Sequence, residues 1–173
     1  MDHRDHVNLI RDGMAGTTWA DLGSGSGAFT LALAELLGRG GTIYSMDRDA
    51  SALHKQVEPL RDSFPEVTVR QLAADFTRPL DLPQVDGIVM ANSLHFVRDK
   101  ASVLPQITAY LRDGGRFVLV EYDTDRGNRW VPFPVSYETW TSMAAAAGLR
   151  DTRRIGSVRS RFLGSIYSAV SVR

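Results

Sequence analysis

Cysteine is absent from the 173-residue sequence, and lysine occurs only at Lys55 and Lys100. Without cysteine the chain can form no disulfide, no thiolate metal site and no covalent intermediate on a thiol. His3 and His6 stand three residues apart but have no clear third ligand nearby, so they predict a solvated N-terminal arm and no metal site. The charged N-terminus lacks the apolar core of a signal peptide, and no apolar run approaches membrane-spanning length. We therefore expect a cytoplasmic protein without a membrane span.

Neither sign of charge is in excess, because 20 Lys and Arg residues balance 20 Asp and Glu residues. The chain as a whole therefore has no electrostatic attraction to nucleic acid or to membranes. One stretch departs from this balance, with Asp151 alone opposing Arg150, Arg153, Arg154, Arg159 and Arg161. No aromatic stacking platform accompanies these arginines, so the stretch is interpreted as a solvated face and a nucleic-acid partner is not expected.

Three glycines at alternate positions follow a short apolar run that ends in an acid. Residues 19–30 read Trp-Ala-Asp-Leu-Gly-Ser-Gly-Ser-Gly-Ala-Phe-Thr. A strand, a glycine turn and a helix make up a nucleotide-binding βα unit, in which glycine lets a ligand approach the backbone and the helix start offers unpaired N–H groups. Taken as Gly23, Gly25 and Ala28, the loop also fits the dinucleotide pattern G-x-G-x-x-A. The loop by itself therefore does not identify the cofactor.

Strand-like and helix-like patterns alternate along the rest of the chain. After the first strand, strands are predicted at 42–46, 67–72, 85–91, 116–122, 152–158 and 163–172, and helices at 29–37, 50–64, 99–112 and 136–147. This alternation predicts an α/β fold with a Rossmann-like, doubly wound, seven-stranded sheet. The sheet should be mostly parallel with an antiparallel C-terminal strand pair. Residues 1–18 are predicted to be an N-terminal arm and residues 19–173 a single domain.

Polar residues follow the predicted strands, where such sheets bind their ligands. Asp21 and the glycines follow the first strand, Asp47 the second, Asp75 and Phe76 the third, and Asn92 to Phe96 the fourth. Each acid also has a purely structural explanation: Asp47 could cap the next helix, and Asp75 could be an ordinary turn residue. Two acids after successive strands, together with an Asp-x-Gly-x-Gly-x-Gly loop, favour a common cofactor site over these separate explanations.

These elements resemble the class I S-adenosylmethionine-dependent methyltransferases, particularly the small-molecule branch that includes the ubiquinone- and menaquinone-biosynthesis type. The loop at 21–27 is similar to the acidic residue and GxGxG motif of that family, Asp47 to its ribose acid, and Asp75-Phe76 to its adenine-site pair. Residues 111–117 are similar to its L-x-P-G-G turn, although Asp113 replaces the usual proline. The resemblance covers residues 19 to 173.

The resemblance implies an S-adenosyl-L-methionine site whose parts are already named. Asp47 would accept hydrogen bonds from the ribose diol and Asp75 from the adenine amino group, while Phe76 would offer an apolar face to the ring. Asp21 would bind the ammonium group, directly or through water. The full set of predicted cofactor residues is Asp21, Gly23, Ser24, Gly25, Gly27, Asp47, Arg48, Asp75, Phe76 and Asn92.

His95 is the candidate general base, because it stands in a stretch similar to the N-x-L-H of the family and would accept a proton near neutral pH. Its alternative role is to pack under the following helix and hold the loop. Tyr122, Arg126 and Trp130 follow the fifth strand and are predicted to face the acceptor. The Asp/Asn-Pro-Pro-Tyr motif of amine methylation is absent, which argues against methylation of the exocyclic amines of DNA bases. We expect a small organic acceptor, with attack by oxygen or carbon ahead of nitrogen.

Three other functions stay open at this point. A nicotinamide-dependent oxidoreductase would share Asp47, but it predicts neither Asp21 two residues before the first glycine nor the antiparallel strand pair. A non-catalytic subunit would bind the cofactor and need a partner chain. An RNA methyltransferase would use the basic C-terminal stretch. Because only about eighteen residues precede the first strand, a second copy of the chain is a candidate to complete the site.

Overall fold

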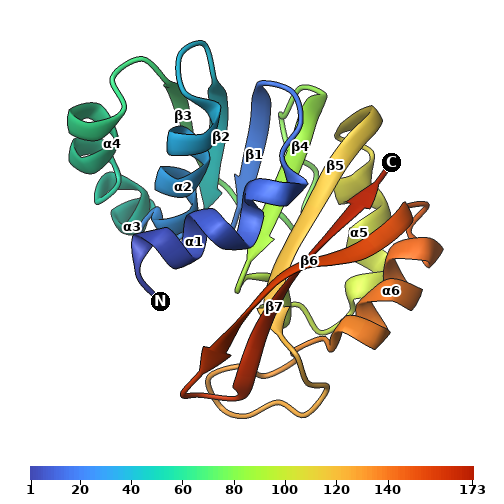
Figure 1. Cartoon of the computed structure of the whole chain (residues 1–173). Coiled ribbons are helices and arrows are strands. Elements are labelled where there is room, and N and C mark those ends of the chain that lie inside the picture. Colours follow the sequence, from blue (N-terminus) through green and yellow to red (C-terminus); the bar gives the residue numbers. More distant parts are fainter.

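One sheet of seven strands runs through the computed structural model, which describes residues 1–173 (Figure 1). Its strands are β1 (Thr18–Leu22), β2 (Thr42–Asp47), β3 (Thr68–Ala73), β4 (Val85–Ala91), β5 (Leu111–Tyr122), β6 (Arg150–Ser160) and β7 (Gly164–Val172). Their order in space is β3-β2-β1-β4-β5-β7-β6, and β7 pairs antiparallel with both of its neighbours. The predicted mostly parallel sheet with an antiparallel C-terminal pair is confirmed.

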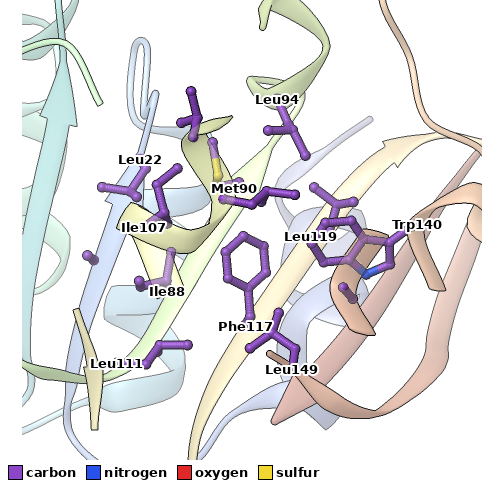
Figure 2. Close-up of a cluster of buried hydrophobic side chains, with 14 of the residues drawn as sticks. Leu22, Ile88, Met90, Leu94, Ile107, Leu111, Phe117, Leu119, Trp140 and Leu149 are labelled. Atoms are coloured by element: carbon purple, nitrogen blue, oxygen red, sulfur yellow. The ribbon is translucent and has the colours of Figure 1, made fainter. Parts of the chain in front are cut away.

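Helices cover both faces of the sheet. They are α1 (His3–Ile10), α2 (Ala28–Leu37), α3 (Ala50–His54), α4 (Val57–Ser63), α5 (Lys100–Thr108) and α6 (Tyr137–Ala146), with short 3-10 turns at Arg11–Gly13 and Leu94–Phe96. One core layer joins α1, α2 and α4 to the sheet, and the other joins α5 and α6 to its opposite face. Figure 2 shows the second layer, where Phe117 and Leu119 of β5 pack beside Trp140 of α6.

The central strand is the most apolar one. β4 lies fourth of the seven strands, and Ile88, Val89 and Met90 are fully buried. Ile88 and Met90 belong to one core layer and Val89 to the other, because successive side chains of a strand point to opposite faces. A strand covered by helices on both sides needs apolar residues where it faces them, as predicted for 85–91. The exception is half-buried Asp86 near the start of β4, which accepts hydrogen bonds from Thr17 N and Thr18 N.

Two predicted helix boundaries are wrong, each for a local reason. The helix predicted at 50–64 is divided into α3 and α4, since Pro59 has no N–H to continue the hydrogen-bond series from α3. The helix predicted at 99–112 ends at Thr108, because Val85 N donates to Tyr110 O at 2.8 Å and Leu111 already pairs with Val85. The turn at 113–115 is therefore an irregularity inside β5 rather than the end of a helix.

The first thirteen residues are packed against the domain. Val7, Leu9 and Ile10 of α1 are buried in the core layer that also contains α2. The His3 ring nitrogen Nε2 lies 2.7 Å from the Glu35 carboxylate. The interpretation of this segment as a solvated arm is thus wrong for its apolar face. None of the helices of the protein is long and apolar enough to cross a bilayer.

Candidate functional site

A cavity of about 680 Å³ opens at the carboxyl ends of the first four strands. The residues that line it come from the segments following β1, β2, β3 and β4, with two more from the N-terminal helix region. They are Gly23, Ser24, Gly25, Ser26, Ala28, Phe29, Asp47, Arg48, Asp49, Ala74, Asp75, Phe76, Thr77, Ala91, Asn92, Ser93, Phe96, Val97, Met1 and His6. The structure thus brings together eight of the ten residues predicted to bind the cofactor.

The glycine loop lines this cavity with main-chain atoms that no glycine side chain covers. Gly23 and Gly25 both have positive φ angles, +79° and +54°, in the left-handed region that favours glycine. A Cβ on Gly23 would lie 2.4 Å from Ser93 Cβ, so the loop packs directly on the segment after β4. A Cβ on Gly25 would meet no atom within 4 Å, which leaves open space where a ligand can contact the main chain.

Asp47 connects the glycine loop to the end of β2. Its Oδ2 accepts a hydrogen bond from Gly25 N at 2.8 Å, and its Oδ1 accepts one from Asp49 N at 2.9 Å. The cap of α3 is Asp49, whose side chain accepts from Ser51 N and Ala52 N, so the helix-cap explanation of Asp47 is wrong. Each Asp47 oxygen keeps acceptor capacity for a second donor, as a ribose diol requires.

Asp75 lines the cavity after β3, and one of its oxygens already accepts hydrogen bonds. Its Oδ1 accepts from Thr77 N at 2.9 Å and from Thr77 Oγ1 at 2.7 Å, and these bonds hold the pKa of Asp75 below its ordinary value. Asp75 is therefore a turn residue and a cavity residue at the same time. Its other oxygen has no hydrogen-bond partner in the protein, and half-buried Phe76 follows it in the lining.

Asn92 has an unusual backbone and an unsatisfied side chain. Its φ angle is +52°, a conformation that asparagine tolerates better than most residues. Its N–H donates to Val120 O at 2.9 Å, which fixes the residue to β5. Asn92 Oδ1 is buried without a hydrogen-bond partner, although buried polar atoms are nearly always paired. Because Asn92 lines the cavity, a ligand that donates a hydrogen bond there would satisfy this atom.

Asp21 and Gly27 are the two predicted cofactor residues that do not line the cavity. Asp21 is 1% exposed, beneath the glycine loop, and accepts a hydrogen bond from Thr30 Oγ1 at 2.7 Å. Burial, opposed by this bond and reinforced by the charge of Asp47, raises the pKa of Asp21 to about 7. Gly27 starts α2 with a φ of +92° and packs against Gln56. A contact of Asp21 with the cofactor ammonium stays a prediction.

A buried polar network under the loop was not predicted from the sequence. Ser45 Oγ lies 2.7 Å from Gln56 Oε1 and 2.9 Å from Ser24 Oγ. Gln56 Nε2 donates to Gly25 O at 2.6 Å and to Ser24 Oγ at 3.0 Å. Both Ser45 and Gln56 are fully buried. These bonds fix the loop from below, so its upper side keeps its shape before a ligand arrives.

His95 lies behind the cavity wall rather than in it. The residue is 3% exposed, and its Nδ1 lies 3.0 Å from both oxygens of fully buried Glu121. The rings of Phe96 and Tyr122 flank its imidazole, at centroid distances of 4.3 and 6.0 Å. If Nδ1 donates its proton to Glu121, Nε2 keeps a lone pair and becomes the basic nitrogen.

A buried lysine joins the two segments that follow β4 and β5. Lys100 Nζ donates to Val97 O and to Phe133 O, both at 2.7 Å, and Phe133 N donates to His95 O at 3.0 Å. Burial lowers the pKa of Lys100, and the negative charge of Glu121 opposes this shift. The loop after β5 is thereby held against the wall that contains His95.

The three residues predicted to face the acceptor lie outside the cavity. Tyr122 is half-buried beside His95, whereas Arg126 and Trp130 are exposed on the loop between β5 and α6. Their role in acceptor binding stays a prediction.

The comparison with known families agrees with this geometry. A family model described as a methyltransferase domain matches residues 20–117, which contain β1 to β4, the glycine loop and most of the cavity lining. The chain belongs to this methyltransferase family. The resemblance to class I S-adenosylmethionine-dependent methyltransferases is thereby confirmed, and with it the cofactor. The ubiquinone-like subtype has only loose support.

Curated relatives of this methyltransferase match slightly less than two thirds of the chain. An uncharacterized methyltransferase of Mycobacterium tuberculosis is 34% identical over 111 residues, which cover 64% of this chain and 42% of that protein. A 2-phytyl-1,4-naphthoquinone methyltransferase of Nostoc punctiforme is 28% identical over 109 residues, which cover 62% of this chain and 47% of that protein. The match thus spans less than half the length of these relatives.

Solved structures share the fold of the methyltransferase over nearly its whole length. The YcgJ protein of Bacillus subtilis has a TM-score of 0.77 at 13% identity, with 99% of each chain covered. A SAM-dependent methyltransferase of Aquifex aeolicus has a TM-score of 0.72 at 18% identity, with 99% of this chain and 93% of that chain covered.

The residues of the cavity fit S-adenosylmethionine. Asp47 has acceptor capacity for a diol, Asp75 has an unpaired oxygen, and Asn92 Oδ1 is a buried acceptor without a donor. The open space above Gly25 allows close approach to the backbone. These features lie around one cavity, which is large enough for a cofactor of this size.

Proposed function

We propose that this protein transfers the methyl group of S-adenosylmethionine to an oxygen or carbon of a small organic acceptor. The observation that carries the proposal is the shared cavity of Asp47, Asp75, Asn92 and the glycine loop. When bound, the cofactor supplies an electrophilic methyl group whose bond to sulfur breaks as the bond to the acceptor forms. The chain contributes alignment of the two reactants and removal of water from between them.

The parts of the site would act on different portions of the ligands. Asp47 would hold the ribose and Asp75 the adenine amino group, while the main chain at Gly23 and Gly25 would lie along the methionine portion. An acceptor that loses a proton needs a base, and we assign His95 to that task. Because His95 does not line the cavity, its proton transfer would pass through a water or through a path between Phe96 and Tyr122. A second copy of the chain that completes the site stays a prediction.

The proposal is tested by calorimetric titration with S-adenosylhomocysteine and, separately, with NAD and NADP. Binding of S-adenosylhomocysteine alone is the expected result. Binding of a dinucleotide alone would overturn the proposal in favour of an oxidoreductase. If S-adenosylhomocysteine binds but no acceptor of any class is methylated unless a partner chain is added, the protein is a cofactor-binding subunit.

Asp47→Ala is expected to weaken S-adenosylhomocysteine binding by about 1.5–3 kcal/mol, as charged hydrogen bonds to the ligand are lost. The loss includes the bond that holds Gly25 N, so the glycine loop also becomes less well positioned. Calorimetry on the variant measures the effect, and Asp62→Ala on exposed α4 is the matched control. An unchanged dissociation constant would remove Asp47 from the site.

His95→Ala is expected to leave S-adenosylhomocysteine binding intact and to slow turnover about 100-fold, as is typical for the loss of a general base. Glu121→Gln should also slow turnover, because the carboxylate that orients His95 Nδ1 loses its charge. The measurement is kcat at saturating acceptor, with exposed His54→Ala as the control. Turnover equal to that of the unmodified enzyme would make the His95–Glu121 pair structural.

A further inference from the structure

Large apolar side chains are exposed at one end of the molecule. Five are more than a third exposed, and four of them, Met1 (51%), Phe96 (59%), Trp130 (67%) and Phe162 (65%), lie toward the cavity end. We call these four residues the apolar rim. The fifth, Val57, belongs to α4. Single exposed apolar residues are ordinary, but several at the same end of a molecule are typical of an interaction surface.

The sheet places the members of the apolar rim beyond the same strand ends. Met1 and Phe96 line the cavity itself. Trp130 stands in the loop after β5, and Phe162 in the turn between β6 and β7. Tyr122 at the end of β5 pairs with Ile166 near the start of β7, and Asp123 N donates to Ser165 O. The loop after β5 and the turn before β7 therefore begin side by side at the same end of the sheet. Figure 1 shows both segments at the lower end of the molecule.

Positive charge accompanies the exposed aromatic residues. Arg126 and Arg129 precede Trp130, and Arg159 and Arg161 precede Phe162. None of these four arginines forms an ion pair in the protein. The two acids of the loop are engaged elsewhere. Asp123 pairs with Arg154 at 2.9 Å, and Asp125 accepts from Ser136 and Thr139. The surroundings of Trp130 and Phe162 are thus locally basic on a chain whose net charge is zero.

We propose that the apolar rim and its four arginines dock on an anionic lipid surface, with the cavity mouth turned toward the bilayer. Tryptophan and phenylalanine at the tips of separate loops can enter the headgroup region, where aromatic rings are favoured. The neighbouring arginines are attracted by anionic headgroups. A nucleic acid would need aromatic rings aligned along a groove on which successive bases stack, and the rim has no such platform. The proposal does not depend on methyl transfer.

The test is co-sedimentation of the full chain with vesicles of phosphatidylcholine alone and of phosphatidylcholine mixed with phosphatidylglycerol. We expect binding to the anionic vesicles that weakens as salt is raised. Trp19 and Trp140 are fully buried, so Trp130 is the exposed tryptophan and its emission should shift to the blue on binding. R159Q/R161Q and Phe162→Ala should each lower the partition coefficient roughly tenfold.

Val57→Ala with Arg61→Gln, which changes an exposed valine and arginine on α4, is the matched control and should leave partitioning unchanged. Retained S-adenosylhomocysteine binding by R159Q/R161Q verifies that the variant folds and separates this proposal from the proposed function. No vesicle binding, or equal binding by the rim variants and the control, would overturn it. Tighter binding of single-stranded RNA, lost in R159Q/R161Q, would also overturn it and indicate a nucleic-acid surface.

Discussion

Gly23→Ala is expected to destabilise the protein by about 3 kcal/mol, whereas Gly25→Ala is expected to keep the fold and weaken cofactor binding. Both glycines have positive φ angles, so each alanine carries a strain of about 1 kcal/mol. The difference lies in what the new methyl group meets. At Gly23 it would collide with Ser93 Cβ at 2.4 Å, and relief requires movement of the segment after β4.

At position 25 the methyl group enters open space in the cavity. It therefore disturbs little of the protein but occupies volume next to the backbone that the ligand would approach. Binding of S-adenosylhomocysteine should weaken roughly tenfold or more, which corresponds to about 1.4 kcal/mol. Urea unfolding and calorimetry on both variants separate the two effects.

Gly40→Ala supplies the control for this pair, since Gly40 also has a positive φ angle of +85° and no neighbour within 4 Å but lies away from the cavity. It should match Gly25→Ala in stability and bind S-adenosylhomocysteine normally. If Gly25→Ala also binds normally, the ligand does not approach the loop there. If Gly23→Ala is as stable as Gly25→Ala, the contact with Ser93 is not a constraint.

Asp21→Asn is expected to remove a pH dependence from the stability of the ligand-free protein. Burial raises the pKa of Asp21 to about 7, from an ordinary value of 3.8. The folded chain therefore keeps a proton that the unfolded chain releases. The stability that comes from this proton is complete below about pH 4 and is lost as the pH rises through about 7. The difference in pKa corresponds to about 4 kcal/mol.

The measurement is the free energy of unfolding of wild type and variant at pH values from 4 to 8. Relative to wild type, Asp21→Asn should gain stability steadily across that range, because asparagine has the same shape and cannot ionise. Other carboxyl groups titrate in both proteins and cancel in the difference. Asp81→Asn, at an exposed carboxylate without hydrogen-bond partners, should show no such gain. Parallel curves for wild type and Asp21→Asn would mean that Asp21 is ionised throughout.

The sequence predicts the structure best where two local signals coincide, namely the two-residue side-chain period of a strand and the turn residues that follow it. β4 is predictable because a strand buried on both faces is apolar along most of its length, and the cavity residues are predictable because they follow strand ends. The same period explains why Asp21 does not line the cavity. It shares a strand face with Trp19, toward α2, whereas Ala20 and Leu22 point to the opposite layer. The position of an acid at a strand end therefore does not by itself show which face of the sheet its side chain occupies.

Other parts of the site depend on contacts between distant segments. Ser45 and Gln56 carry no local sign that they meet beneath the glycine loop, since a polar residue in a strand or helix is usually solvated. The pairing of His95 with Glu121 joins residues 26 positions apart. Pro59 was a local signal that the helix at 50–64 would break, and it was overlooked because the apolar spacing continued past it.

The position of β7 has a consequence for how the chain folds. This strand is the last element in the sequence, yet it lies inside the sheet between β5 and β6, and Tyr167 within it is fully buried. During synthesis the parallel half of the sheet can assemble as it emerges, but β5 then has an unpaired apolar edge until residues 164–172 leave the ribosome. Such an edge can pair with another chain. Until residues 164–172 pair with β5, the nascent protein is therefore open to aggregation through this edge.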